Sequence, residues 1–283
     1  MITIKNRYLT VKIKKFGAQL SSIVCDGVEY MWGADPAVWG SSAPIMFPVC
    51  GGLKDDKYLY GGKQYNMIKH GFSRVSHFET ESVSDDRAVL LLKANEQTKE
   101  VYPFDFELRV IFELTDNSVR INYQVDNNGT DTMYFNIGAH EGYATPEGIE
   151  DYDIIFDDNV TLQAHRFYGE LLCEQTHLLV KNSKFLPLYD KYFYMQSLPF
   201  TNISFNAATL RNRKTEKSVR VEFPDAKHLL LWHKHGAGYI CIEPWNGLPD
   251  VPDSSYDITQ KKGITALDAG HTYCFRHTIS IGK

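Results

Sequence analysis

Three segments of the chain place ionisable side chains among glycines and aromatic residues, where acid–base chemistry could occur. In the last of them, residues 239–250, Glu243 follows four apolar residues and precedes a Pro–Trp pair. Carboxylates are rarely buried without a partner or a task. An acid at the mouth of an apolar strand, with Trp245 close by, is the arrangement that a general base beside a sugar ring would need.

Two histidine segments supply possible acid or donor groups. Residues 136–143 follow an apolar run and carry Gly-Ala before His140, which leaves room for a substrate beside the ring. Further upstream, His70 is followed by glycine and, four residues on, by Arg74. Glycine lets the backbone pass close to a ligand, and arginine adds a charged donor. Taken alone, each pattern is more typical of a turn or a loop histidine than of a site, so both depend on further evidence.

Neither a metal nor a cofactor is expected from the motifs. The sequence lacks a glycine-rich dinucleotide fingerprint and clustered metal-ligand spacing. The pair His233 and His235 lies on a turn-prone segment and is interpreted as solvated surface. Five scattered cysteines form no disulfide framework and are interpreted as reduced structural thiols of a cytoplasmic protein: Cys25, Cys50, Cys173, Cys241 and Cys274.

The elements that must position these residues are strands. Residues 10–16, 106–112 and 119–125 alternate apolar with polar side chains, as strands buried on one face do. The last two are separated by a turn containing Asp and Asn and are predicted to form a hairpin. No stretch keeps a helical apolar period for more than about three turns. Further strands are predicted at residues 88–93, 202–206, 218–223, 228–232, 239–242 and 272–281.

These patterns predict an all-β fold with few short helices, a sandwich or barrel within a single domain covering residues 1–283. The formal net charge of −5 offers no basic field for nucleic acid, so none is expected as a partner. No apolar run is long enough to span a bilayer, and the N-terminus reads as a strand and not as a signal peptide. We therefore expect no membrane partner.

Several motifs occur in an order that resembles the aldose 1-epimerase (galactose mutarotase) family, particularly its bacterial galactose-mutarotase-related branch. The resemblance runs from about residue 10 to the end of the chain, and no single motif decides it. The motifs are Trp39 with residues 43–48, then residues 60–65, 70–74, 138–140, 241–247 and 262–270.

The resemblance implies a large antiparallel β-supersandwich that binds a small-molecule sugar. By family analogy, Glu243 is the base that takes the proton from the anomeric hydroxyl, and His140 is the acid that protonates the ring oxygen. His70 is expected to hydrogen-bond the sugar, with Arg74 and Trp245 as further substrate contacts. Ring opening moves two protons at neighbouring oxygens, so an acid and a base must flank C1 together. A monomer or homodimer is expected.

Three departures from the family pattern leave the substrate open. Gly52 stands where many relatives carry an arginine, Glu141 follows the motif histidine where proline is usual, and Gln196 stands where relatives of this branch often carry an aspartate. Glu141 could raise the pKa of His140 or face away. The leading hypothesis is a mutarotase for a free aldohexose. The alternatives are a hexose-6-phosphate 1-epimerase, with Arg74 and Lys54 at the phosphate, a non-catalytic carbohydrate-binding or regulatory protein, and a purely structural protein.

Overall fold

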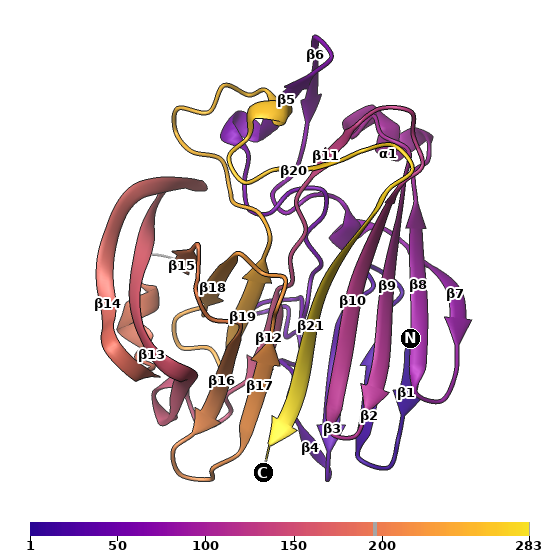
Figure 1. Ribbon diagram of the computed structural model, residues 1–283. Coiled ribbons are helices and arrows are strands. Elements are labelled where there is room, and N and C mark those ends of the chain that lie inside the picture. The colour runs from indigo at the N-terminus through magenta and orange to yellow at the C-terminus, as the bar shows by residue number, and fades with distance from the viewer. Residues whose placement is uncertain (195–196, 283) are drawn as a thin grey trace.

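The computed structural model describes residues 1–194 and 197–282. Its largest element is a nine-stranded antiparallel sheet (Figure 1). In sheet order, the strands are β14 (Leu171–Pro187), β13 (Tyr152–Tyr168), β16 (Ala207–Asn212), β17 (Ser218–Glu222), β21 (Thr272–Gly282), β10 (Ser118–Asn127), β9 (Phe106–Thr115), β8 (Arg87–Lys93) and β7 (Glu79–Val83).

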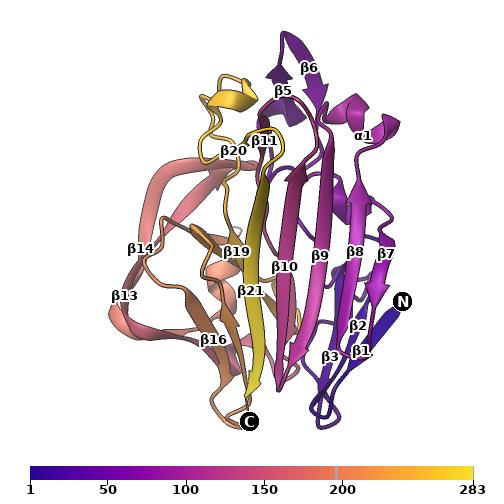
Figure 2. The same ribbon diagram turned by 45° about the vertical axis from the view of Figure 1, so that its right-hand side comes forward.

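Two four-stranded sheets lie behind this large sheet (Figures 1 and 2). The first, at the N-terminus, contains β1 (Ile2–Lys5), β2 (Leu9–Ile13), β3 (Leu20–Cys25) and β4 (Val28–Glu29). The second contains, in sheet order, β12 (Glu141–Ala144), β19 (Tyr239–Trp245), β18 (His228–Trp232) and β15 (Leu198–Thr201). Two short pairs complete the strands: β5 (Lys57–Tyr60) with β6 (Lys63–Asn66), and β11 (Met133–Phe135) with β20 (Thr265–Leu267).

Helices are short, as the sequence predicted. In the described ranges, α1 (Glu96–Val101) is the only α-helix, and none of the helices there is long and apolar enough to cross a lipid bilayer. The 3-10 turns are η1 (Lys54–Asp56), η2 (Ser73–Val75), η3 (Ile149–Asp151), η4 (Asp190–Phe193) and η5 (Ile258–Gln260). The predicted all-β class is confirmed.

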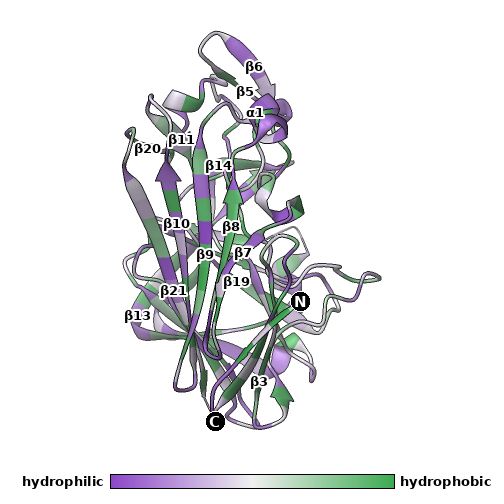
Figure 3. Ribbon diagram, turned by 90° about the vertical axis from the view of Figure 1, so that its right-hand side faces the viewer, coloured by the Kyte–Doolittle hydropathy of each residue, from purple (hydrophilic) through white to green (hydrophobic). Residues whose placement is uncertain are grey.

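Burial of alternate side chains on one face stabilises the large sheet. Along β9, every second residue from Phe106 to Leu114 is buried, and the residues between are more exposed. Figure 3 shows this alternation as bands of hydropathy on the strands of this layer. Each buried Leu, Ile or Phe contributes about 1.5–3 kcal/mol. The predicted hairpin forms, with β9 and β10 joined by a turn in which Asp116 has φ +50°.

The structure differs from the predicted strands in two places. Residues 202–206 form no strand: Asn202 has φ +52°, outside the extended region, and β16 begins only at Ala207. Conversely, the 17-residue strands β13 and β14 were not predicted. Their pairing contains several register shifts, and their middle portions carry exposed polar residues, so the strict alternation is lost. They form the curved arm that bends away from the body in Figure 1.

Strand β19 is buried on both faces along its whole length. Because successive strand side chains point to opposite faces, Tyr239, Cys241, Glu243 and Trp245 share one face. On the opposite face, Ile240 and Ile242 belong to the main hydrophobic core. This strand therefore separates the core from the site described next.

Candidate functional site

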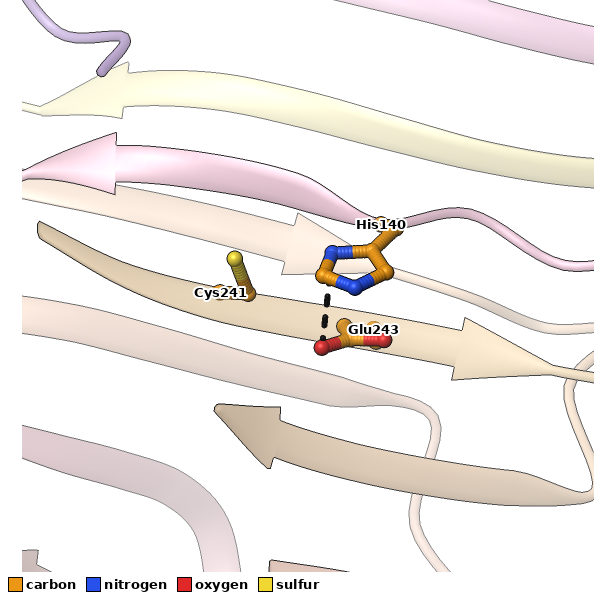
Figure 4. Close-up of side chains that lie close together, drawn as sticks. All are labelled: His140, Cys241 and Glu243. Atoms are coloured by element: carbon orange, nitrogen blue, oxygen red, sulfur yellow. Dashed lines mark ion pairs between the residues drawn. The ribbon is translucent and has the colours of Figure 1, made fainter. Parts of the chain in front are cut away.

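His140 and Glu243 meet because β12 pairs with β19. The register places Glu141 opposite Ile242, and the Ala139 N–H donates to the Pro244 carbonyl at 3.0 Å, so His140 and Glu243 are cross-strand neighbours. Nδ1 of His140 lies 3.5 Å from Oε1 of Glu243 (Figure 4). Only 9% of His140 and 2% of Glu243 is exposed, so both groups sit in a largely water-excluded place.

His70 is held beside this pair by two loops that hydrogen-bond to each other. Its N–H donates to the Gly51 carbonyl at 2.9 Å, and the Gly51 N–H donates to its Nδ1 at 3.1 Å. Since Nδ1 accepts, the ring hydrogen of neutral His70 is on Nε2. Burial lowers the pKa of His70 well below its usual value, which favours this neutral donor. A Cβ at Gly71 would lie 2.1 Å from the Phe47 carbonyl oxygen, so only glycine fits after His70.

The five predicted site residues surround one pocket of about 360 Å³, the size range of a site for a small ligand. The structure thus brings together residues that are distant in sequence. Their catalytic and sugar-binding roles are still predictions. The lining residues are Trp39, Ser41, Pro44, Gly51, Lys69, His70, Arg74, His140, Phe167, Glu170, Ser197, Leu230, Trp232, Glu243, Trp245 and Pro249. A larger hollow of about 1310 Å³ lies under the β13–β14 arm, but His140 and Glu243 do not line it.

Trp245 forms part of the pocket's floor. It is 2% exposed, and its Nε1–H donates to the Ala139 carbonyl at 3.2 Å. Its ring centroid is 5.8 Å from that of His70, which is itself 5.5 Å from that of His140. Trp245 is therefore fixed by the protein, and it offers the pocket an apolar surface of the kind on which sugar rings rest.

Two tryptophans in the pocket wall were not predicted as site residues. The ring centroid of Trp39 lies 5.3 Å from that of His140 and 5.1 Å from that of Trp232. A Cβ at Gly142 would be 2.7 Å from the Trp39 ring, so that glycine allows the indole to approach β12. Trp39 was visible in the motif order, whereas Trp232 enters through the pairing of β18 with β19, a long-range register that the sequence does not display.

The rim of the pocket is charged. Arg74 donates through Nε to the Lys69 carbonyl at 3.2 Å, and the Lys69 ammonium forms an ion pair with Glu170 at the β13–β14 turn. A Cβ at Gly52 would lie 2.8 Å from Cβ of Glu170, so Glu170 occupies space close to where an arginine at position 52 would begin. A side chain at position 52, such as the arginine of many relatives, would therefore require Glu170 in the β13–β14 turn to move. The alternative phosphate contact, Lys54, is not among the lining residues; its N–H and ammonium bond to Asp250 and Ser254.

Glu141 faces away from the site. Its Oε1 lies 3.0 Å from Nε2 of His277 and accepts a 3.4 Å hydrogen bond from the Tyr123 hydroxyl, on the core side of β12. The adjacent carboxylate is therefore paired elsewhere. Gln196, the third departure from the family pattern, lies outside the described residues.

The interpretation of residues 233–235 as solvated surface is wrong for His233. That histidine is 2% exposed, with Nδ1 at 2.7 Å from the Tyr239 carbonyl and Nε2 at 2.8 Å from Asp190. It belongs to buried strand-end packing, whereas His235 is exposed as expected. The five cysteines all lie in the described ranges, and none of them is joined to another in a disulfide bond.

Burial shifts the two central pKa values in opposite directions. It raises the pKa of Glu243 well above its usual value and lowers the pKa of His140 to about 3. Each shift disfavours the charged form of its group. Because the two side chains are in contact, they titrate as a pair. The pair is most stable when it holds one proton, since its net charge is then zero. Such a pair can give one proton and accept another without changing that charge.

The fold defines the class of the chain: it is an antiparallel β-supersandwich of the galactose mutarotase type. The aldose 1-epimerase family model matches residues 1–279, and the chain belongs to this family. The LacX proteins of Lactococcus lactis subsp. lactis, plasmid and chromosomal, are each 34% identical to this chain, in alignments that cover 94% of this chain and 94% of theirs.

Solved structures agree with this assignment. A galactose mutarotase related enzyme from Lactobacillus acidophilus is 33% identical with a TM-score of 0.94, covering 100% of this chain and 97% of that one. A galactose mutarotase-like protein from Lactobacillus casei is 29% identical with a TM-score of 0.93, covering 100% of both chains. Family and structures together support an activity of the sugar epimerase or mutarotase kind.

Proposed function

We propose that the protein interconverts the α and β anomers of a free aldohexose by opening and reclosing the sugar ring. The observation that carries this proposal is the contact of His140 with Glu243 at 3.5 Å beside a pocket of about 360 Å³. A carboxyl and an imidazole so placed can act on two oxygens attached to one carbon. General acid–base catalysis by each group contributes typically about 10²–10⁴-fold.

The proton movements balance within the pair. In the uncharged form that burial favours, the proton of the pair is on Glu243, and it moves to His140 before the sugar reacts. The Glu243 carboxylate then takes the proton of the C1 hydroxyl while the His140 imidazolium gives a proton to the ring oxygen, and the bond between C1 and that oxygen breaks. The products are an open-chain aldehyde, a neutral carboxylic acid and a neutral imidazole. Rotation about the C1–C2 bond and reversal of both transfers close the ring as the other anomer. The pair stays net neutral throughout, which is what a buried site favours.

The other lining residues would hold the sugar. The Nε2–H of neutral His70 is a donor for a hydroxyl or for the ring oxygen, and Arg74 is a charged donor at the rim. Trp245 and Trp39 supply flat apolar surface for the carbon–hydrogen face of the ring. These contacts account for positioning, which is worth as much to the rate as the proton transfers themselves.

A second candidate is a hexose-6-phosphate 1-epimerase, favoured by the two cationic side chains at the rim, Lys69 and Arg74. Arginine suits phosphate because its guanidinium can donate two parallel hydrogen bonds. Against it, Lys69 is already paired with Glu170, and position 52 carries no arginine. The free sugar is therefore the first choice.

The experiment is to add the pure α-anomers of glucose, galactose and glucose 6-phosphate in turn and to follow relaxation to the anomeric mixture by polarimetry. We expect acceleration with a free hexose, and loss of that acceleration in Glu243→Gln. Acceleration only with glucose 6-phosphate would select the second candidate. Sugar binding by calorimetry without acceleration of any sugar would contradict the enzyme and favour a carbohydrate-binding protein.

A further inference from the structure

Cys241 adds a third ligand-type side chain to the pair at the pocket. It is two residues before Glu243 on β19, so both side chains leave the strand on the same face. His140 reaches them from the neighbouring strand end. One potential ligand atom from each of the three residues lies within 4.8 Å of the others (Figure 4).

The spacing suits a small tetrahedral cation. Zinc binds nitrogen and oxygen at about 2.0–2.2 Å and thiolate sulfur at about 2.3 Å, so ligand atoms around one tetrahedral ion lie roughly 3.3–3.7 Å apart. The distance from His140 Nδ1 to Glu243 Oε1 is already 3.5 Å. The widest separation, at most 4.8 Å, has to close by about 1 Å. Rotation of a side chain can supply that shift. A mixed set of imidazole, thiolate and carboxylate selects zinc over magnesium or calcium.

A second observation points independently to a missing partner. Nδ1 of His140 is buried and makes no hydrogen bond with any residue of the described ranges, although Glu243 is close. Buried polar atoms are nearly always partnered. In the neutral tautomer that carries its hydrogen on Nε2, Nδ1 of His140 offers a lone pair, which is the form that binds metal ions.

We propose that His140, Cys241 and Glu243 together bind one thiophilic divalent cation of the zinc type, and that the cation inhibits the enzyme. Binding releases two protons to solvent, the thiol proton of Cys241 and the one proton that the acid–base pair holds, and the cation then occupies the nitrogen of His140 and the carboxylate of Glu243. Water from the pocket that His140 and Glu243 line would supply the fourth ligand of the tetrahedron. The binding site is independent of the proposed function, whereas the inhibition depends on it.

The binding half is tested with cobalt(II) added to the untagged full chain, because a cobalt–thiolate bond absorbs in the near ultraviolet. We expect one equivalent of Co²⁺ to produce that band, zinc to displace it, and both Cys241→Ser and Cys241→Ala to abolish it. The matched control is Cys274→Ser, which removes an exposed thiol and should leave the band intact. No band, or a band lost in Cys274→Ser instead, would overturn the proposal.

Inhibition by the cation is tested by measuring mutarotation of whichever sugar the protein accelerates in the experiment proposed above. We expect Zn²⁺ to slow the wild-type enzyme, a chelator to restore the rate, and Cys241→Ser to keep its activity while needing at least tenfold more Zn²⁺ for the same inhibition. Equal sensitivity of wild type and variant would overturn the proposal. If no sugar is accelerated but the Cys241-dependent cobalt band appears, the proposed function fails and the metal site stands.

Discussion

The described part of the chain contains two buried glutamate–histidine pairs, which lie on opposite sides of the strands β12 and β19. The pocket pair is Glu243 with His140, and the core pair is Glu141 with His277. Glu141 and His140 are neighbours in sequence, yet alternation along the strand sends their side chains to opposite sides. In the core pair the two atoms are 3.0 Å apart and form a hydrogen bond. In the pocket pair they are 3.5 Å apart, and Nδ1 of His140 has no hydrogen-bond partner in the described part of the chain.

The difference shows that burial and residue type do not by themselves define a reactive pair. Both glutamates are almost fully buried, at 1% and 2% exposure. What separates the pairs is access. His140 and Glu243 line a pocket, whereas the core pair lies against Tyr123 of the large sheet, whose hydroxyl donates to Glu141 and whose ring centroid is 5.5 Å from that of His277. A pair enclosed in the core can only stabilise the fold, whereas a pair that lines a pocket can act on a ligand.

The largest expected effect is on the reaction rate and separates the two histidines. His140→Asn should lower accelerated anomer exchange by about 10²–10⁴-fold, because the proton donor to the ring oxygen is removed. The matched variant His277→Asn keeps the pocket intact, so its folded fraction should exchange anomers at nearly the wild-type rate. Polarimetry with equal concentrations of folded protein measures both. Equal losses in the two variants would remove the distinction between the pairs.

The second-largest expected effect is on the free energy of unfolding, and it concerns the core pair. Removing one partner of a buried pair costs roughly 3–5 kcal/mol, so Glu141→Ala should lower the free energy of unfolding by that amount. Urea denaturation followed by tryptophan fluorescence measures it. Replacing both partners with apolar residues, as in Glu141→Met with His277→Phe, should recover much of the loss. A Glu141→Ala variant as stable as wild type would contradict a structural role for the core pair.

The third effect is the pH dependence of stability at Glu243. Its pKa is raised by burial in the folded state, so between the unfolded pKa, about 4.3, and the higher folded pKa the native state holds more protons than the unfolded state. This group therefore makes stability fall as pH rises through that window. Glu243→Gln should remove this pH dependence of the free energy of unfolding. Its melting temperature should be higher than that of the wild type at pH 7 and equal to it at pH 4. Equal changes at both pH values would show that Glu243 is not shifted upward.

The smallest expected effect concerns the charged rim, a feature that only the pocket pair has. Arg74→Gln should slow exchange of a free hexose by about tenfold, since a hydrogen bond from a charged group contributes roughly 1.5–3 kcal/mol and Arg74 is only partly buried. With glucose 6-phosphate the loss should be larger, because a phosphate is itself charged and can accept two parallel hydrogen bonds from the guanidinium. The ratio of kcat/KM for the two sugars measures this. A larger loss with the free hexose would exclude Arg74 as a phosphate contact.

Sequence patterns predicted the elements whose side chains alternate strictly. The hairpin of β9 and β10 follows directly from that alternation, and the segments with Glu243, His140 and His70 were found because ionisable residues interrupt apolar runs. The β13–β14 arm was not predicted, since its register shifts break the two-residue period. The place of Trp232 depends on cross-strand register, and the direction of Glu141 depends on where β12 begins. Both are set by long-range pairing that local sequence does not encode.

The most direct test compares Glu243→Gln with Glu141→Gln by exchange NMR on the anomeric protons of an accepted hexose. Both variants remove one buried carboxylate and keep its shape, so they differ only in which pair is changed. We predict that Glu243→Gln loses the accelerated exchange while remaining folded, and that Glu141→Gln retains it. Full activity in Glu243→Gln would contradict its role as the base and, with it, the assignment of the pocket pair as the catalytic one.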